Sequence, residues 1–316
     1  MIRHRFYGMA VIATVMVMLT CSFGWAQQSQ QNRIVHLELT AGGEYMTGHS
    51  DYSIGSSRTI SELDFPLDVW LWSIGGRLKV VDRFNLGIRY RGNISNDPGT
   101  VTDSDFGIFS GQGISLPTVT GTSLDIFSET DASLDANLLD VMAEWGFYKR
   151  SHWTFLIGFA YTYQKFSYDL SNIVQQYPSL PGIPPQSVEG PIAEYEVKYK
   201  IPMVTGGIAF GGNSRLGLEA RFGYSWKAKA EDHGNWFSRS PALTFDGDND
   251  GPAYRFSFRA HYDLTPNWFL GTGVEYLKVD ADGTQTQMRN GRFSASIDQS
   301  IDTEQTNVIL QAGFRY

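Results

Sequence analysis

The chain ends in Asn307-Val308-Ile309-Leu310-Gln311-Ala312-Gly313-Phe314-Arg315-Tyr316. Every second residue from Val308 to Tyr316 is apolar, and the polar residues Asn307, Gln311 and Arg315 fall between them. Successive side chains of a strand point to opposite faces, so this pattern predicts a β-strand with one apolar and one polar face. An edge strand of a soluble sandwich is the alternative interpretation of this segment.

The same alternation of apolar and polar residues recurs upstream, and short and long connections alternate along the chain. Tight turns are expected near 81–83, 149–152, 211–214 and 264–267, and longer polar loops near 49–58, 95–130, 171–194, 231–250 and 282–300. The connections separate ten expected strands, at 34–48, 59–80, 84–95, 130–147, 153–170, 192–210, 215–231, 252–263, 268–282 and 302–316. Short turns on one side and long loops on the other are typical of membrane β-barrels.

The composition agrees with this layout. Aromatic residues make up 14% of the 316 residues, glycines number 33, and charged residues are only 18%. No mature segment has eighteen consecutive apolar residues, which argues against membrane-spanning helices. We therefore expect an all-β fold, a ten-stranded antiparallel transmembrane β-barrel. Several expected strands exceed the ~9–11 residues that cross a bilayer, so the barrel should rise above the membrane on the loop side.

Residues 1–26 have the features of a signal peptide. Arg3 and Arg5 give a basic start, an apolar core follows from Met9 to Leu19, and Ala26 ends a small-residue cleavage site. The single cysteine, Cys21, lies in this segment, in a poor context for lipid attachment. Residues 27–316 are then expected to form one outer-membrane β-barrel domain without disulfides.

The charge balance excludes nucleic acid as a partner. Removing Arg3 and Arg5 from 25 basic residues leaves 23, against 33 acidic residues, a formal net charge of −10. Nucleic-acid binding requires a basic surface. The sequence also contains no Cys/His cluster with the spacing of a metal site and no motif for a bound cofactor.

Two polar clusters near the loop ends of strands are candidates for catalysis. Asp103 and Asp105 are alternate residues of one strand and could present two carboxylates to one face. Glu231 and His233 could likewise present a carboxylate beside an imidazole, the common general base. Asp232, between them, is an alternative partner of His233, but on a strand it would face away from it. Each cluster alone is more often a solvated loop segment than a site.

The order and surroundings of these clusters resemble the omptin family of outer-membrane aspartyl-type proteases. Ser61-Glu62-Leu63-Asp64-Phe65 and Thr102-Asp103-Ser104-Asp105-Phe106 resemble two family motifs, and Glu231-Asp232-His233 falls at the family's Asp-x-His. The run from Tyr195 to Met203, the segment from Tyr262 to Asn267 and the closing Ala312–Tyr316 are similar too. The resemblance extends over most of the mature chain.

The resemblance implies an endopeptidase in a bacterial outer membrane, with its active face extracellular and polypeptides as substrates. Asp103 and Asp105 would form one catalytic pair and Glu231 with His233 the other, with water activated between them. It also implies lipopolysaccharide as a partner and possible activator besides the membrane lipid, bound by Tyr161, Lys165 and Lys198. No other cofactor is implied. Snorkelling interfacial lysines are the alternative for Lys165 and Lys198.

Three departures from the family's pattern keep alternatives open. Glu231 stands where the family has Asp. This substitution leaves two interpretations open: an active protease, or a catalytically inactive barrel that serves as an adhesin or surface structural protein. Tyr52 and Lys229 stand where the family has acidic pocket residues, so the sequence does not predict an Arg-selective pocket. Asp246-Gly247-Asp248-Asn249-Asp250-Gly251 matches the start of a Ca²⁺ loop, but Ser257 replaces the twelfth-position Glu, and a solvated loop is the alternative.

Overall fold

The computed structural model describes residues 35–316 apart from 56–57, 82, 112–119, 212–214 and 239–241. The predicted signal peptide lies outside the described residues. The described part is almost entirely β-sheet, with one four-residue helix, α2 (Ile108–Gly111). No helix among the described residues is long and apolar enough to cross a membrane.

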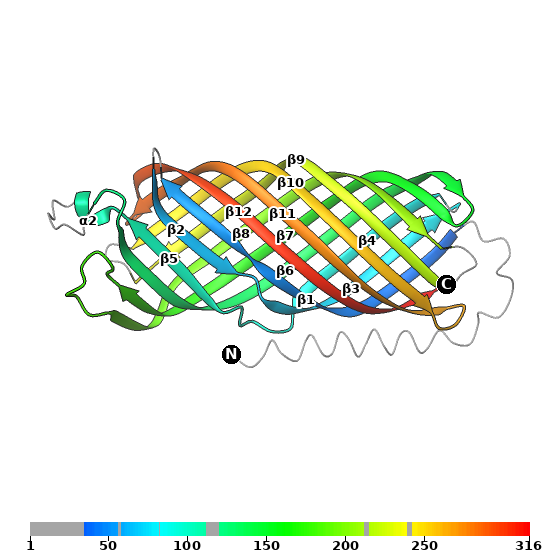
Figure 1. Cartoon of the computed structure of the whole chain (residues 1–316), viewed down its shortest axis with the longest axis horizontal. Coiled ribbons are helices and arrows are strands. Elements are labelled where there is room, and N and C mark those ends of the chain that lie inside the picture. The colour runs from blue at the N-terminus through cyan, green and yellow to red at the C-terminus, as the bar shows by residue number, and fades with distance from the viewer. Residues whose placement is uncertain (1–34, 56–57, 82, 112–119, 212–214, 239–241) are drawn as a thin grey trace. The chain divides into compact units, whose positions relative to one another are not determined.

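Twelve antiparallel strands form one sheet that closes on itself (Figure 1). In chain order they are β1 (Val35–Gly55), β2 (Thr59–Pro66), β3 (Val69–Val80), β4 (Phe84–Asn93), β5 (Thr100–Phe106), β6 (Leu124–Arg150), β7 (Trp153–Gln176), β8 (Gln186–Phe210), β9 (Leu216–Trp236), β10 (Leu243–Asp263), β11 (Trp268–Arg289) and β12 (Arg292–Arg315).

The ring has ten strand positions, as predicted, because two positions are interrupted. β2 and β3 both pair with β1, and β4 and β5 both pair with β6. β3 pairs with β4 and β2 pairs with β5. β2 and β3 therefore share one position of the ring, and β4 and β5 share the next. Pairing of β1 with β12 closes the barrel and leaves no open edge there.

The predicted turn positions fall between consecutive strands, but the predicted loops are too long. Short connections join β3 to β4, β6 to β7, β8 to β9 and β10 to β11, and residues 82 and 212–214 of these connections lie outside the described residues. At the opposite end, which we call the loop end, the strands extend into segments expected to be loops. β9 and β10 include the expected loop 231–250 except for residues 237–242, and β11 and β12 are separated only by residues 290–291.

A belt of exposed apolar side chains surrounds the half of the barrel nearer the turns. It includes Leu39, Ile88, Val141, Phe159, Phe222, Phe256, Val274 and Leu310. Exposed aromatic residues flank it, among them Tyr90, Tyr161, Trp226 and Tyr254 toward the loop end and Trp145, Trp153, Tyr262 and Tyr316 toward the turns. An apolar band with two aromatic girdles is the outer surface of a membrane barrel. Strands of 21 to 27 residues, such as β9 and β6, extend well beyond it.

Within this belt, charged side chains fill the barrel interior. Arg89, Arg91, Arg255 and Arg259 face Glu44, Asp140 and Glu275, a set that we call the central charge cluster. Arg91 and Glu44 are fully buried. Asp140 accepts four hydrogen bonds from Arg89, Arg91 and Arg255 at 2.6 to 3.2 Å, and a fifth from Thr162 at 2.7 Å. Paired charges therefore occupy the interior at membrane depth.

Beyond the belt, one outer face carries a lateral row of aspartates. Asp280 lies opposite Asp302, Asp302 opposite Asp51, and Asp51 opposite Asp64, across β11, β12, β1 and β2. Like charges directly opposite each other destabilise an antiparallel sheet. Lys278 contacts Asp302 at 3.0 Å and His49 contacts Asp51 at 3.3 Å, so cations compensate part of this repulsion.

Candidate active site

A β-bulge in β9 decides which side chains of the candidate site face the barrel interior. Between Ser225 and Ala228, β9 has one residue more than β10 and β8 need, so the register with both shifts there. Trp226 and Lys227 are both exposed, and the Lys227 amide donates a hydrogen bond to Ser225 Oγ at 3.3 Å. An extra residue reverses the inward and outward sets beyond it, because the side-chain period of a strand is two.

The two sides of the bulge follow opposite parity. On the turn side, the odd-numbered residues Gly223 and Ser225 are buried, whereas on the loop side the even-numbered Ala228, Ala230 and Asp232 are buried. Without the bulge, Glu231 and His233 would face inward together with Ser225. With it, Asp232 faces inward instead.

The structure thus corrects the expectation that Glu231 and His233 face Asp103 and Asp105 across the interior. Glu231 lies on the outer wall and accepts hydrogen bonds from Lys200 Nζ at 2.7 and 2.6 Å. His233 is exposed, and its Nδ1 lies 2.7 Å from Asp246 Oδ1 on the outward face of β10. The two side chains share a face, as predicted, but it is the outer face of the barrel.

Asp232 is the carboxyl group that β9 places inside. It is 4% exposed, and its two oxygens accept hydrogen bonds from Asn249 Nδ2 and Gln299 Nε2, each at 3.3 Å. Burial raises its pKa to about 6, although the hydrogen bonds from Gln299, Tyr195 and Asn249 oppose this rise. Asp232 is five residues beyond the bulge and outside the apolar belt.

Asp103 and Asp105 lie on the inner wall, on β5. Both line a cavity of about 280 Å³ at the loop end. Their backbones pair with Leu63 and Ser61 of β2, and Ser61 Oγ donates a hydrogen bond to Asp103 Oδ1 at 3.0 Å. The predicted pairing of these two carboxylates on one face is therefore present in the fold.

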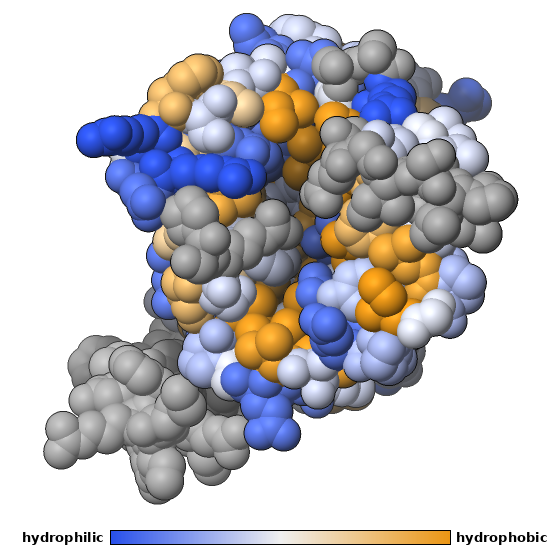
Figure 2. Space-filling model, turned by 90° about the vertical axis from the view of Figure 1, so that its left-hand side faces the viewer, coloured by the Kyte–Doolittle hydropathy of each residue, from blue (hydrophilic) through white to orange (hydrophobic). Residues whose placement is uncertain are grey.

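The cavity brings Asp103 and Asp105 together with residues that the sequence did not single out. Gln299 lines it from β12 and also donates to Asp232, so Asp232 lies one side chain behind its wall. Arg289 is the single cation among the described residues that line it, and none of these is a histidine. Figure 2 faces this end of the barrel and shows apolar side chains around the central hollow.

Sequence reasoning did not find the inward role of Asp232. The triplet Glu231-Asp232-His233 offers two opposite faces, and alternation alone cannot say which is inside. The deciding feature is the bulge at Trp226–Lys227, where two consecutive outward residues interrupt the alternation. That irregularity is the signal that could have reversed the assignment.

Tyr161, Lys165 and Lys198 gather on the outer wall, as the lipid-binding hypothesis requires. Lys165 of β7 lies directly opposite Lys198 of β8, just beyond the exposed Tyr161. Glu196 contacts both lysines, at 2.5 and 2.6 Å. Partial burial would raise the pKa of Glu196, but the hydrogen bonds from Lys165 and Lys198 hold it below its usual value. The carboxylate thus neutralises one of the two positive charges.

The candidate Ca²⁺ segment is part of β10 and not a loop. Asp246, Asp248 and Asp250 are alternate, outward-facing residues. Asp246 contacts His233, and Asp248 lies 3.9 Å from Lys229. Within the described ranges, no group of three or more His, Cys, Asp or Glu side chains is arranged to hold a metal ion.

Comparisons with known proteins add a family to this geometry. The family model described as the Omptin family matches residues 51–316. No curated protein matches the chain.

Among solved structures, the outer membrane protease OmpT from Escherichia coli is similar over 92% of this chain and 99% of its own, with a TM-score of 0.75 and 15% identity. The outer membrane protein OprG from Pseudomonas aeruginosa covers 88% of this chain and 95% of its own, with 10% identity and a TM-score of only 0.38. At these identities the OmpT match shows the fold alone, and the OprG match carries no argument. The family match and the closed barrel together show that this chain is an outer-membrane β-barrel that belongs to the omptin family.

Proposed function

We propose that the protein is an endopeptidase that cleaves surface-accessible polypeptides with water activated by Asp103 and Asp105. The observation that carries the proposal is that these two carboxylates line one cavity at the loop end of the barrel. Long connections lie outside the cell in barrels of this kind, so the loop end is the extracellular face. Polypeptides outside the cell then reach the cavity without crossing the membrane.

The chemistry needs only groups that line the cavity and water. One carboxylate accepts a proton as the water oxygen forms a bond to the peptide carbonyl carbon. The same carboxyl group then returns the proton to the amide nitrogen as the carbon–nitrogen bond breaks. The other carboxylate holds the water by a hydrogen bond. Glu231 and His233 take no part in this scheme because they lie on the outer wall.

A non-catalytic barrel that binds polypeptides, as an adhesin or surface structural protein, is the second candidate. The outward position of His233 favours it, because a histidine is the commonest general base in hydrolysis. Both candidates use the same cavity, and they differ in whether a bound chain is cut.

The test is hydrolysis of an unbiased peptide mixture by barrel refolded with lipopolysaccharide. Asp103→Asn and Asp105→Asn should each reduce the cleavage rate at least ~100-fold, a loss typical of removing a general base. His233→Ala and Glu231→Gln are the matched controls and should leave the rate within about twofold. A wild-type protein without cleavage would favour the binding function. Loss of cleavage in His233→Ala would contradict the assignment made from the outward position of His233.

Lipopolysaccharide is the partner that we propose for the outer wall. Lys165 and Lys198 would bind a lipid phosphate beside the Tyr161 ring. What supports this is their direct opposition just beyond the aromatic girdle. Replacing both lysines by Ala should remove the thermal stabilisation that lipopolysaccharide gives to the refolded barrel. Lys149→Ala, at the turn end of β6, is the control. Equal stabilisation of all variants would favour snorkelling lysines.

A further inference from the structure

The cavity that holds Asp103 and Asp105 is walled mostly by apolar and aromatic side chains. Its lining includes Tyr52, Leu63, Phe65, Tyr195, Leu243 and Phe245. Its volume of about 280 Å³ lies just below the ~300–1,000 Å³ of pockets that enclose whole ligands. The space therefore suits one large side chain of a longer chain better than a complete small molecule.

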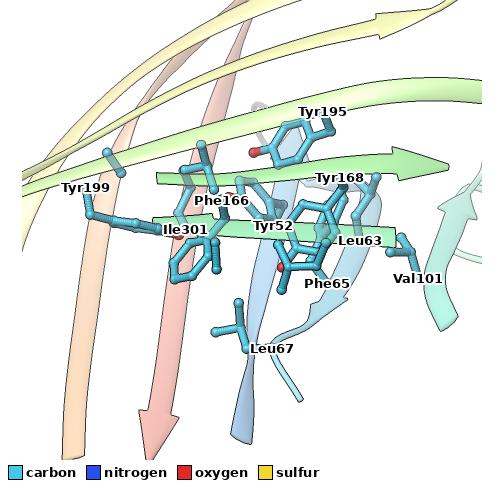
Figure 3. Close-up of a cluster of buried hydrophobic side chains, with 14 of the residues drawn as sticks. Tyr52, Leu63, Phe65, Leu67, Val101, Phe166, Tyr168, Tyr195, Tyr199 and Ile301 are labelled. Atoms are coloured by element: carbon cyan, nitrogen blue, oxygen red, sulfur yellow. The ribbon is translucent and has the colours of Figure 1, made fainter. Parts of the chain in front are cut away.

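Aromatic contacts make the wall rigid. The Phe65 and Tyr195 rings stack at 4.5 Å, and Tyr52 meets both edge-on at 5.3 and 5.4 Å. Figure 3 shows these rings converging from different strands together with Tyr168. Such pairs stabilise the wall beyond the burial of their area. The wall is thus a preformed surface and is not assembled by the ligand.

Gly234 sets the position of one part of this wall. A Cβ atom at Gly234 would lie 2.0 Å from the Phe245 ring, because the far end of the ring occupies the space that a side chain at Gly234 would enter. Phe245 also approaches Tyr195, at 5.9 Å between ring centroids. The missing side chain at position 234 therefore leaves room for the ring beside the cavity.

The apolar wall disfavours a basic side chain inside the cavity, although the charges alone do not exclude one. Asp103 and Asp105 line the β5 wall, where they hold the water, and Arg289 adds one positive charge. A guanidinium or ammonium group would lose its hydration against rings and meet Arg289. An apolar side chain is instead stabilised in proportion to the area that it buries.

We infer that the cavity is a specificity pocket for a large aliphatic or aromatic side chain of the polypeptide, next to the bond that is cut. This inference rests on the proposed function, since it names the substrate class of the same site. Tyr52 is part of the aromatic wall, whereas Lys229 lies outward near Asp248. Neither residue supplies an acidic group to bind arginine.

The first experiment compares one peptide sequence with Phe, Leu or Arg at its central position. Wild-type barrel should cut the Phe and Leu peptides about 100-fold faster than the Arg peptide, judged by kcat/KM. A ratio of this order is what loss of apolar contact plus burial of a charge produces. Equal or faster cleavage of the Arg peptide would overturn the pocket and leave the endopeptidase intact.

Two variants alter the pocket without touching Asp103 or Asp105. Gly234→Ala should push the Phe245 ring into the cavity and lower kcat/KM for the Phe peptide at least tenfold. Gly206→Ala is the matched control, because a Cβ atom there meets nothing within 4 Å. Ile54→Glu, at a half-buried lining position, should raise kcat/KM for the Arg peptide about tenfold. No change in either variant would contradict the assignment.

A binding measurement separates failure of the pocket from failure of catalysis. Trp236 lines the cavity, so its fluorescence should change when a Phe peptide binds to the Asp103→Asn variant. The fluorescence change should be absent in a variant that also carries Trp236→Phe. The Arg peptide should bind the Asp103→Asn variant with about tenfold lower affinity than the Phe peptide. Binding of the Phe peptide without cleavage by wild type would overturn the proposed function and support the pocket. Neither cleavage nor binding would overturn both.

Discussion

Replacing Arg91 by Met should destabilise the barrel strongly, whereas replacing Arg259 by Met should not. Both arginines belong to the central charge cluster, and Met keeps most of the apolar volume of either side chain. Arg91 lies 2.6 Å from Asp140 and 3.4 Å from Glu44, and its side chain is fully buried. Arg259 approaches its nearest cluster carboxylate, Glu275, only to 3.6 Å.

The magnitude follows from counting charges in the cluster. Its four arginines face three carboxylates, so the loss of Arg259 leaves three of each. Loss of Arg91 instead removes the shortest contact to Asp140 and one partner of Glu44. Breaking a buried pair costs about 3–5 kcal/mol, whereas replacing a poorly compensated buried charge is often neutral or stabilising. We expect a loss near 4 kcal/mol for Arg91→Met and less than about 1 kcal/mol for Arg259→Met.

Unfolding of the refolded barrels in guanidinium chloride, followed by tryptophan fluorescence, measures both effects. The two variants should keep the same dependence on denaturant, so the shift of the midpoint reports the change in free energy of unfolding. Equal losses, or a greater loss for Arg259→Met, would refute the account of the cluster as three carboxylates satisfied by three of its arginines.

Three further predictions concern the loop end. A cysteine at position 231 should react within minutes with a membrane-impermeant maleimide in the folded barrel, and one at 232 should not, since Asp232 is 4% exposed; equal reactivity would contradict the parity set by the bulge. The pKa of Asp232 is raised to about 6 from its ordinary 3.8, so its favourable contribution is complete below ~3.8 and is lost as pH rises through ~6, on the order of 3 kcal/mol. Asp232→Asn should therefore flatten the fall of unfolding free energy between pH 4 and 7, and an unchanged profile would refute the role of this carboxyl. Burial raises the pKa of Asp51, His49 opposes this rise, and Asp64 and Asp302 raise the pKa further. Asp51→Asn should therefore stabilise the barrel at pH 7.5 by ~0.2–1 kcal/mol per relieved pair of aspartates. The gain in stability should shrink in 1 M salt, and a destabilised variant would contradict the prediction.

The strands inside the membrane could be predicted because water and lipid impose a strict alternation on them. The closing segment that begins at Asn307 follows this alternation, and the structure confirms it as the end of β12. From Asp246 to Asp250, beyond the apolar belt, both faces of β10 carry polar or small residues. Asp246, Asp248 and Asp250 face water while Gly247 and Asn249 face inward, so no apolar pattern distinguishes this strand from a loop.

The candidate site was predicted in part for the same reason. Asp103 and Asp105 lie on one face of one strand, and a period of two is enough to place them together. The facing of Glu231 and His233 depends on how many residues separate them from the membrane-embedded part of β9. The sequence prediction assumes strict alternation through Trp226 and Lys227, whereas β9 has one extra residue there. One unrecognised bulge thus reversed the assignment of a whole segment.

The bulge also determines which kinds of genetic change this wall can absorb. A substitution in β9 alters a single side chain and leaves its neighbours in place. Insertion or deletion of one codon between Ser225 and Ala228 would exchange the complete inner and outer sets of the distal strand at once. Such a change would carry Glu231 and His233 into the lumen and turn Asp232 toward the environment. A one-residue gap at this point in an alignment of relatives therefore indicates that the inner and outer residues of the distal strand are exchanged, even where the flanking residues are identical.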